Sequence, residues 1–218
     1  LITNLFIGFS IGTNVVMARA IGANNPEKAS RTTHTSMLLA VVNGFIVGIV
    51  GFFASKGMLE LMNSPENVID KAALYLKIYF LGSPASLVYN FGASVLRAKG
   101  DTRRPLYFLV IAGILNVLLN LFFVIVCNMD VAGVALASAI SQCVSAGLIL
   151  HALTKVQDCY ALDFKQAKLD PAMTKSILAL GLPAGFQNAI FAIANLFIQA
   201  GVNSFDSLMV KGNSAAAN

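Results

Sequence analysis

The chain has 218 residues, of which 57% are apolar and 11% are charged, and its formal net charge at pH 7 is +5. Soluble domains carry about 25% charged residues, so this composition excludes an ordinary soluble enzyme and indicates an integral membrane protein. The basic residues are spread over several short loops instead of one soluble face, which argues against a nucleic-acid partner.

Six charge-free apolar stretches follow one another along the chain. A helix needs about 20 residues to cross a bilayer, and the first stretch barely reaches this length. None of them alternates like the strands of a membrane barrel, and an open sheet edge has no partner in lipid. We therefore predict an all-α integral membrane protein with six transmembrane helices, at 1–18, 36–55, 78–96, 106–127, 131–150 and 176–205.

The first three spans carry signals for helix packing and bending. Gly8 with Gly12, and Gly44 with Gly48, have the GxxxG spacing that lets two helices approach closely. The third span contains Pro84, which lacks a backbone donor and predicts a kink. The sixth span also contains a proline, for which we expect the same effect.

Polar side chains recur at helical spacing on four of the spans. On the fourth span, Asn116 and Asn120 lie one helical turn apart and share a face. Polar atoms in hydrocarbon must find partners or water, so the stripes predict one shared, hydrated interior. The stripes comprise Ser83, Ser86, Asn90 and Ser94; Asn116 and Asn120; Ser138, Ser141, Gln142 and Ser145; and Asn188, Asn195 and Gln199.

A packing role is the alternative for these side chains. Ser, Thr, Asn and Gln hydrogen-bond between membrane helices at about 0.6 kcal/mol each without any transport role, and we assign that role to the single serines. For Asn116 and Asn120 both interpretations stay open, because two amides at mid-depth are costly unless a partner or a cavity serves them.

The orientation follows from the basic residues. Of the 15 Lys and Arg residues, 11 fall in the segments 19–35, 97–105 and 154–175, which alternate with weakly basic segments along the chain. Cytoplasmic loops carry the excess of Lys and Arg. We therefore expect a multi-pass protein of the cell (plasma) membrane with these three loops in the cytoplasm.

Histidine and cysteine indicate no metal site. His34 and His151 lie at opposite ends of different spans and are expected to be interfacial side chains. The three cysteines have no CxxC spacing, so they predict neither a metal site nor a disulfide framework. No cofactor is expected.

Several motifs then resemble one family in collinear order. The stretch 94–124, SVLRAKGDTRRPLYFLVIAGILNVLLNLFFV, resembles the multidrug and toxic compound extrusion (MATE) transporters, whose fourth and fifth helices are joined by a basic Gly-Asp-Thr loop. So do GTNVVMARAIGANNPEKA at 12–29 and VAGVALASAISQ at 131–142. Near the end, LGLPAGFQNAIF at 180–191 and NSFDSLMVKGNSAAAN at 203–218 continue the resemblance.

The resemblance implies an incomplete two-bundle architecture. MATE transporters consist of two six-helix bundles that rock about a central cavity, and the spans here would be the family's second to seventh helices. Residues 1–153 would then form the first bundle without its first helix. Residues 154–175 would be the cytoplasmic linker between bundles, and residues 176–218 would begin the second bundle. The complete protein is expected to be a monomer.

The resemblance also implies a candidate site. Asn116 matches an Asn of the family's cation site in the first bundle, and Ser138 matches its hydroxyl residue. Asn120 stands where one branch of the family has Asp, and an amide can neither titrate nor carry a full negative charge. The coupling ion, H⁺ or Na⁺, therefore stays open, with possible Na⁺ ligands at Asn116, Asn120 and Ser138. The full candidate substrate and cation site is Asn116, Asn120, Ser138, Gln142, Asn90, Gln187 and Asn188.

We thus expect a secondary active antiporter, not an enzyme, that exports cationic or amphipathic small molecules. A flippase of the same superfamily for a lipid-linked or amphipathic headgroup is the first alternative, and it would favour a basic cavity instead of amides. A membrane-embedded enzyme is the second, but the spans show no nucleophile with a base or metal. A purely structural scaffold is disfavoured by the polar stripes.

Overall fold

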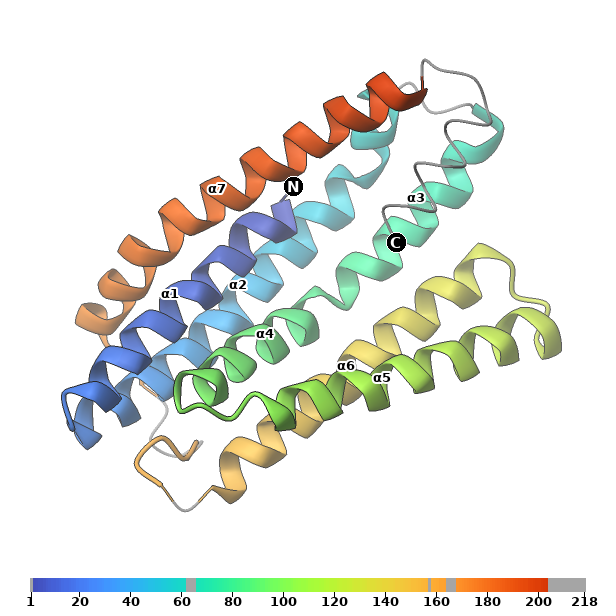
Figure 1. The fold of residues 1–218 in the computed structure, drawn as a ribbon. Helices are drawn as coiled ribbons and strands as arrows, with labels where there is room; N and C mark the ends of the chain where they lie inside the picture. Colours follow the sequence, from blue (N-terminus) through green and yellow to red (C-terminus); the bar gives the residue numbers. More distant parts are fainter. Residues whose placement is uncertain (1, 62–65, 157, 164–167, 204–218) are drawn as a thin grey trace.

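The computed structural model describes residues 2–61, 66–156, 158–163 and 168–203, and all regular structure within these ranges is helical (Figure 1). This confirms the all-α prediction. The elements are α1 (Ile2–Gly22), α2 (Pro26–Leu61), α3 (Glu66–Leu81), α4 (Ser83–Ala98), α5 (Arg103–Leu121), the π-helical turn η1 (Phe122–Val126), α6 (Val131–Lys155) and α7 (Pro171–Asn203).

Within the described part of the chain, four helices are long and apolar enough to cross a membrane: Pro26–Gly57, Arg103–Val126, Val131–Lys155 and Pro171–Asn195. The helix at the N-terminal end contributes a shorter apolar segment, Phe6–Gly22. The third predicted span is divided between α3 and α4, each of 16 residues. The protein is therefore a multi-pass membrane protein, while the count of six spans stays a prediction.

The break between α3 and α4 has a local cause. Pro84 has no N–H with which to continue the helix, so a carbonyl oxygen of the preceding turn needs another donor. Ser83 supplies it, because its Oγ lies 2.7 Å from the carbonyl oxygen of Phe80 and 3.0 Å from that of Gly44 of α2, and these two acceptors share its single hydroxyl proton. The predicted kink is thus present at Gly82, and the contact of Ser83 with Gly44 joins it to α2. By contrast, α7 continues as one helix through Pro183.

Glycines let α1 and α7 pack backbone to backbone. A Cβ on Gly8 would lie 2.2 Å from the Cα of Gly185, and a Cβ on Gly12 would lie 2.7 Å from the nitrogen of Gly181. Real Cβ contacts are never this short, so only glycine allows this approach. The predicted packing role of Gly8 and Gly12 is confirmed, and their partner is a second GxxxG pair on α7.

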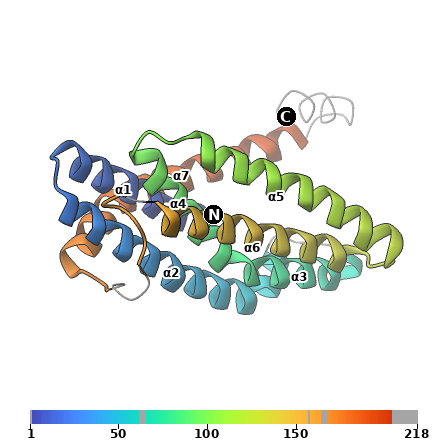
Figure 2. The same cartoon turned by 90° about the horizontal axis from the view of Figure 1, so that it is seen from below.

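Helix α4 lies at the centre of the described bundle and packs on α1, α2 and α6. Its side chains Phe91, Val95 and Leu96 are fully buried in the main apolar cluster. Helices α5 and α6 run side by side as a hairpin along one flank (Figures 1 and 2). Apart from Pro105 and Ala112, α5 buries none of its side chains, so it presents an apolar face suited to lipid or to further protein.

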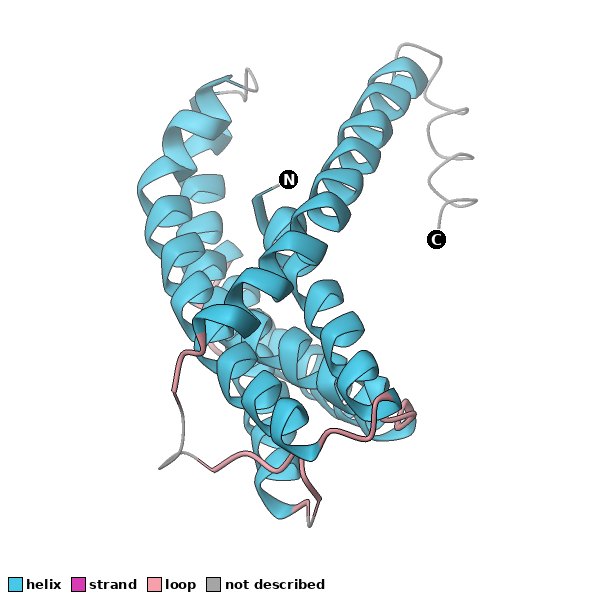
Figure 3. Cartoon of the chain, turned by 90° about the vertical axis from the view of Figure 1, so that its left-hand side faces the viewer, coloured by secondary structure: helices cyan, strands magenta, loops and turns pink. Residues whose placement is uncertain are grey.

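The connections that carry most of the basic residues lie at one end of the molecule. The turns after α1 and α4 and the segment before α7 lie at one end of the molecule, as Figure 3 shows, and the α5–α6 turn lies at the other. The first three connections are those that hold most of the Lys and Arg residues. Their common position is what the alternating charge pattern predicted, whereas the side of the membrane that they face is untested.

Candidate ion and substrate site

An amide–hydroxyl network joins α5 to α6. Asn116 Nδ2 donates to Ser141 Oγ at 3.2 Å and to Ser138 Oγ at 3.4 Å. Asn120 Nδ2 donates to Asn116 Oδ1 at 3.0 Å, so the two amides form a chain along one face of α5. These side chains are half-buried or buried, and each of them is neutral.

The two serines can accept from Asn116 because their own protons are used within α6. Ser138 Oγ donates to the carbonyl oxygen of Val134 at 3.0 Å, and Ser141 Oγ donates to the carbonyl oxygen of Ser138 at 2.9 Å. Each hydroxyl oxygen is then left with lone pairs that face α5. Because the serine protons bond to the α6 backbone, the Asn116 amide is the donor and the two hydroxyl oxygens are the acceptors between the helices.

Two amide oxygens near this network are buried without a hydrogen-bond partner among the described residues: Asn120 Oδ1 and Gln142 Oε1. Gln142 points at the break between α3 and α4, because a Cβ on Gly82 would lie 2.7 Å from its Oε1. A buried acceptor without a hydrogen-bond partner costs about 1–3 kcal/mol of folding free energy. Each of these oxygens would therefore be stabilised by a hydrogen-bond donor, a water molecule or a cation. The π-helical turn η1 begins two residues after Asn120.

The remaining predicted residues lie apart from the network. Asn90 is half-buried on α4 and donates to the carbonyl oxygen of Ser86 at 2.8 Å. Gln187 is exposed and Asn188 is half-buried on α7, which packs on α1 and α2 (Figure 1). The described structure therefore brings Asn116, Asn120 and Ser138 together, whereas the side chains on α7 belong to another face.

Ser141 is the network member that the predicted site omitted. It accepts from Asn116 at a shorter distance than Ser138 does. The signal was present, because Ser141 belongs to the polar stripe of its span and lies three residues after Ser138. Only the rotation of α6 against α5 shows that both hydroxyls reach the same amide.

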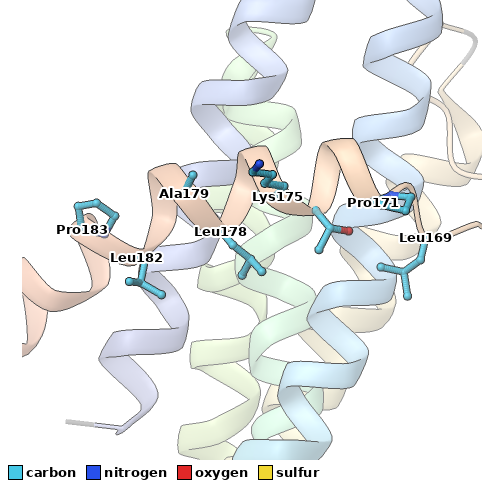
Figure 4. Close-up of a pocket in the computed structure, with 8 residues that line it drawn as sticks. Leu169, Pro171, Lys175, Leu178, Ala179, Leu182 and Pro183 are labelled. Carbon is cyan, nitrogen blue, oxygen red and sulfur yellow. The ribbon is translucent and has the colours of Figure 1, made fainter.

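An apolar groove of about 730 Å³ lies on α7 and the segment before it (Figure 4). Leu178 and Leu182 project from the same side of the helix, and Lys175 is the charged side chain of the lining. The groove holds none of the predicted site residues. Its apolar walls suit hydrocarbon chains or other helices, so we do not place the transport site there.

The described part of the 154–175 segment is anchored to the helix ends. Lys99 Nζ, just after α4, lies 2.7 Å from Asp158 Oδ2 and 5.4 Å from the ring centre of Tyr160. The hydrogen bond from Lys99, followed by that from the backbone N–H of Cys159, lowers the pKa of Asp158 below its ordinary value. Burial, followed by the hydrogen bond to Asp158, raises the pKa of Cys159 above its ordinary value.

The interfacial position expected for His34 stays a prediction, but the residue is not exposed at a surface. It is only 5% exposed, within a run of buried polar residues in the first turns of α2. This run packs against the segment before α7. Sequence spacing could not reveal this, because the partner lies 129 residues away. His151 is exposed at the end of α6.

The fold and this buried network define a multi-pass, all-helical membrane protein with neutral polar groups between its spans. The MatE family profile matches residues 1–122, more than half of the chain. The chain therefore belongs to the MATE family.

Known relatives and solved structures are similar to this chain over nearly its whole length. The probable multidrug resistance protein YpnP of Bacillus subtilis (strain 168) is 30% identical over 213 residues, which are 97% of this chain and 47% of that protein. The inward-facing structure of a multidrug resistance MATE family transporter of the MOP superfamily has a TM-score of 0.82 at 26% identity, over 91% of this chain and 45% of that one. The crystal structure of MATE in the bent conformation has a TM-score of 0.87 at 24% identity, over 99% and 48%. The chain spans about half the length of these proteins.

Proposed function

We propose that this chain forms part of a secondary active exporter, which moves cationic or amphipathic small molecules out of the cell in exchange for H⁺ or Na⁺ by alternating access. The observation that carries the proposal is the buried network between α5 and α6, with its orphaned oxygens at Asn120 and Gln142. Membership of the MATE family supports it, as does the name of the Bacillus relative, a probable multidrug resistance protein.

In this proposal the network supplies oxygen ligands. Hard cations bind carboxylate, carbonyl and hydroxyl oxygens as ligands. The proposed Na⁺ ligands are Asn120 Oδ1, Asn116 Oδ1 and Ser138 Oγ. Because none of these groups titrates near neutral pH, coupling to H⁺ would require an acid outside the network. Asn90, Gln187 and Asn188 would contact the exported compound from other walls of the cavity.

The rest of the architecture is part of the same proposal. Residues 1–153 belong to the first bundle and residues 154–175 to the cytoplasmic linker, in a monomeric, non-enzymatic protein of the plasma membrane. Residues 176–218 begin the second bundle, although 204–218 lie outside the described residues. The flippase alternative predicts basic groups beside the cavity, whereas the network between α5 and α6 is neutral. The enzyme alternative needs a nucleophile with a base.

The test is Asn120→Asp in the complete protein, reconstituted into liposomes. The new carboxyl group would lie beside the Asn116 amide, where desolvation raises its pKa while a bound cation lowers it. We expect the variant to fold and its export of a fluorescent cation to acquire an altered dependence on pH or Na⁺. Were Asn120 to face lipid, a charge there would cost about 2.5–3.5 kcal/mol and expression would fall instead.

Asn25→Asp is the matched control. Asn25 Oδ1 accepts from the backbone nitrogen of Lys28 at 2.9 Å at the start of α2, and Asp performs the same cap. This variant should leave the pH and Na⁺ profile unchanged. An unchanged profile in Asn120→Asp, together with an equally silent Asn116→Ala, would show that the amides only pack the helices.

A further inference from the structure

A buried histidine joins α2 to the segment before α7. His34 Nδ1 lies 2.7 Å from the carbonyl oxygen of Ser30, one turn earlier in α2. On the other side of the ring, His34 Nε2 lies 3.0 Å from the backbone nitrogen of Asp163. Thr35, the next residue of α2, accepts from the backbone N–H of Asp170 at 3.2 Å and reinforces the contact.

Hydrogen-bond chemistry fixes the protonation state of this ring. A carbonyl oxygen only accepts, so His34 Nδ1 must carry a hydrogen, and a backbone N–H only donates, so Nε2 must offer its lone pair. Only the neutral imidazole satisfies both contacts. A second proton would set Nε2–H against the N–H of Asp163, which removes that bond and leaves a charge in a buried position.

Three of the charged groups near the ring are bound to one another. On α2, Arg31 lies 3.1 Å from Glu27 and 3.4 Å from Asp170. The Asp170 carboxylate also accepts from two backbone N–H groups in the first turn of α7. A polar cavity of about 480 Å³ beside the ring gives water a path to it. The charged residues that α2 and the preceding segment bring to this corner are Glu27, Arg31, Asp163, Lys168 and Asp170.

We propose that His34 is a pH-sensitive latch: the neutral imidazole holds the segment around Asp163 against α2, and protonation releases it. The contact is stabilising while the ring is neutral, so it is present at higher pH and lost as the pH falls. This regulation goes beyond the export function and does not depend on which compound or ion is moved.

Hydrogen–deuterium exchange of the complete protein tests the latch without altering the segment. The readout is the protection factor of the peptide 158–163, corrected for the intrinsic pH dependence of exchange. We expect it to fall at least about fivefold between about pH 8 and 5.5. The neutral variant His34→Gln should lose this pH response, and the charged variant His34→Lys should be poorly protected at both pH values.

Several outcomes would overturn the proposal. One is an unchanged protection factor in the parent protein. Another is the same fall in His34→Gln, because the response would then come from Glu27, Asp163 or Asp170. If His34→Gln does not fold, the ring nitrogens of His34 can be assigned by NMR in the parent, because a variant such as His34→Asn or His34→Lys identifies its signals and His151→Gln removes those of the other histidine of these 218 residues. A hydrogen on Nε2 at about pH 8 would contradict the latch.

Discussion

Single residues decide how closely the helices of this protein approach. Gly8 and Gly12 meet Gly181 and Gly185, and no side chain larger than hydrogen fits between the two backbones. In a membrane, where apolar surface gains little by leaving lipid, such close van der Waals packing is a main source of helix association. The α1–α7 contact should therefore be sensitive to a single methyl group.

We predict that Gly181→Ala destabilises the protein by about 1–3 kcal/mol. Its Cβ would lie 2.6 Å from the Cα of Phe9, which is backbone and cannot move aside cheaply. Gly147→Ala is the control, because nothing lies within 4 Å of that position and alanine favours the helix by about 0.5–1 kcal/mol. Melting in detergent should show opposite signs for the two variants, and equal shifts would contradict the close contact.

The segment between α6 and α7 connects two helices and also makes contacts of its own with α2 and with the end of α4. Its described residues are docked at three places: Lys99 with Asp158, His34 with Asp163, and Thr35 with Asp170. Tyr160 and Leu162 are buried in the main apolar cluster as well. The described part of this segment is therefore packed on the helix ends and is not an extended tether.

The Lys99–Asp158 contact should not respond to pH near neutrality. The pKa of Asp158 is lowered from 3.8, so its contribution is present above that value and is lost only as the pH falls through the lower folded value. The pKa of Lys99 is raised from 10.5, so its contribution is lost only as the pH rises through the higher folded value. In the His34→Gln background, which removes the pH response proposed for His34, the effect of Asp158→Asn on the protection of the peptide 158–163 should therefore be constant between about pH 5 and 9.

Hydrogen–deuterium exchange of the peptide 158–163 would measure this effect. The pair is exposed to solvent, so the loss of protection should be small. Lys155→Met removes a basic residue of the same region without touching the pair and should change nothing. A loss in Asp158→Asn that disappears between about pH 7 and 5 would show that the contact depends on another titrating group.

At the scale of the whole molecule, charge decides orientation. The basic connections lie at one end of the bundle and the α5–α6 turn lies toward the other (Figure 1). Asp130, at the end of that turn, lies 2.6 Å from Lys71 of α3. Basic loops are retained on the cytoplasmic side during insertion. The charge pattern therefore predicts that the end of the bundle with the basic connections faces the cytoplasm.

Single cysteines at the positions of Lys99 and Lys71, in a background without Cys127, Cys143 and Cys159, test this orientation. An impermeant maleimide should label the Lys71→Cys variant in intact cells. It should label the Lys99→Cys variant only after permeabilisation. Labelling of both variants from outside would refute the arrangement, and labelling of neither would require other positions on the same loops, such as Arg103.

The helical class, the apolar stretches and the polar face of the fourth span could be predicted from the residues alone, because hydropathy and helical period are local properties. The close contact of Gly8 and Gly12 and the kink at Pro84 were predictable in the same way. Three contacts became visible only in the folded protein: Ser141 shares the amide of Asn116, Gln142 faces Gly82, and His34 is buried against Asp163. These depend on how helices far apart in the chain rotate and dock, because their hydrogen bonds need partners that sequence spacing cannot specify.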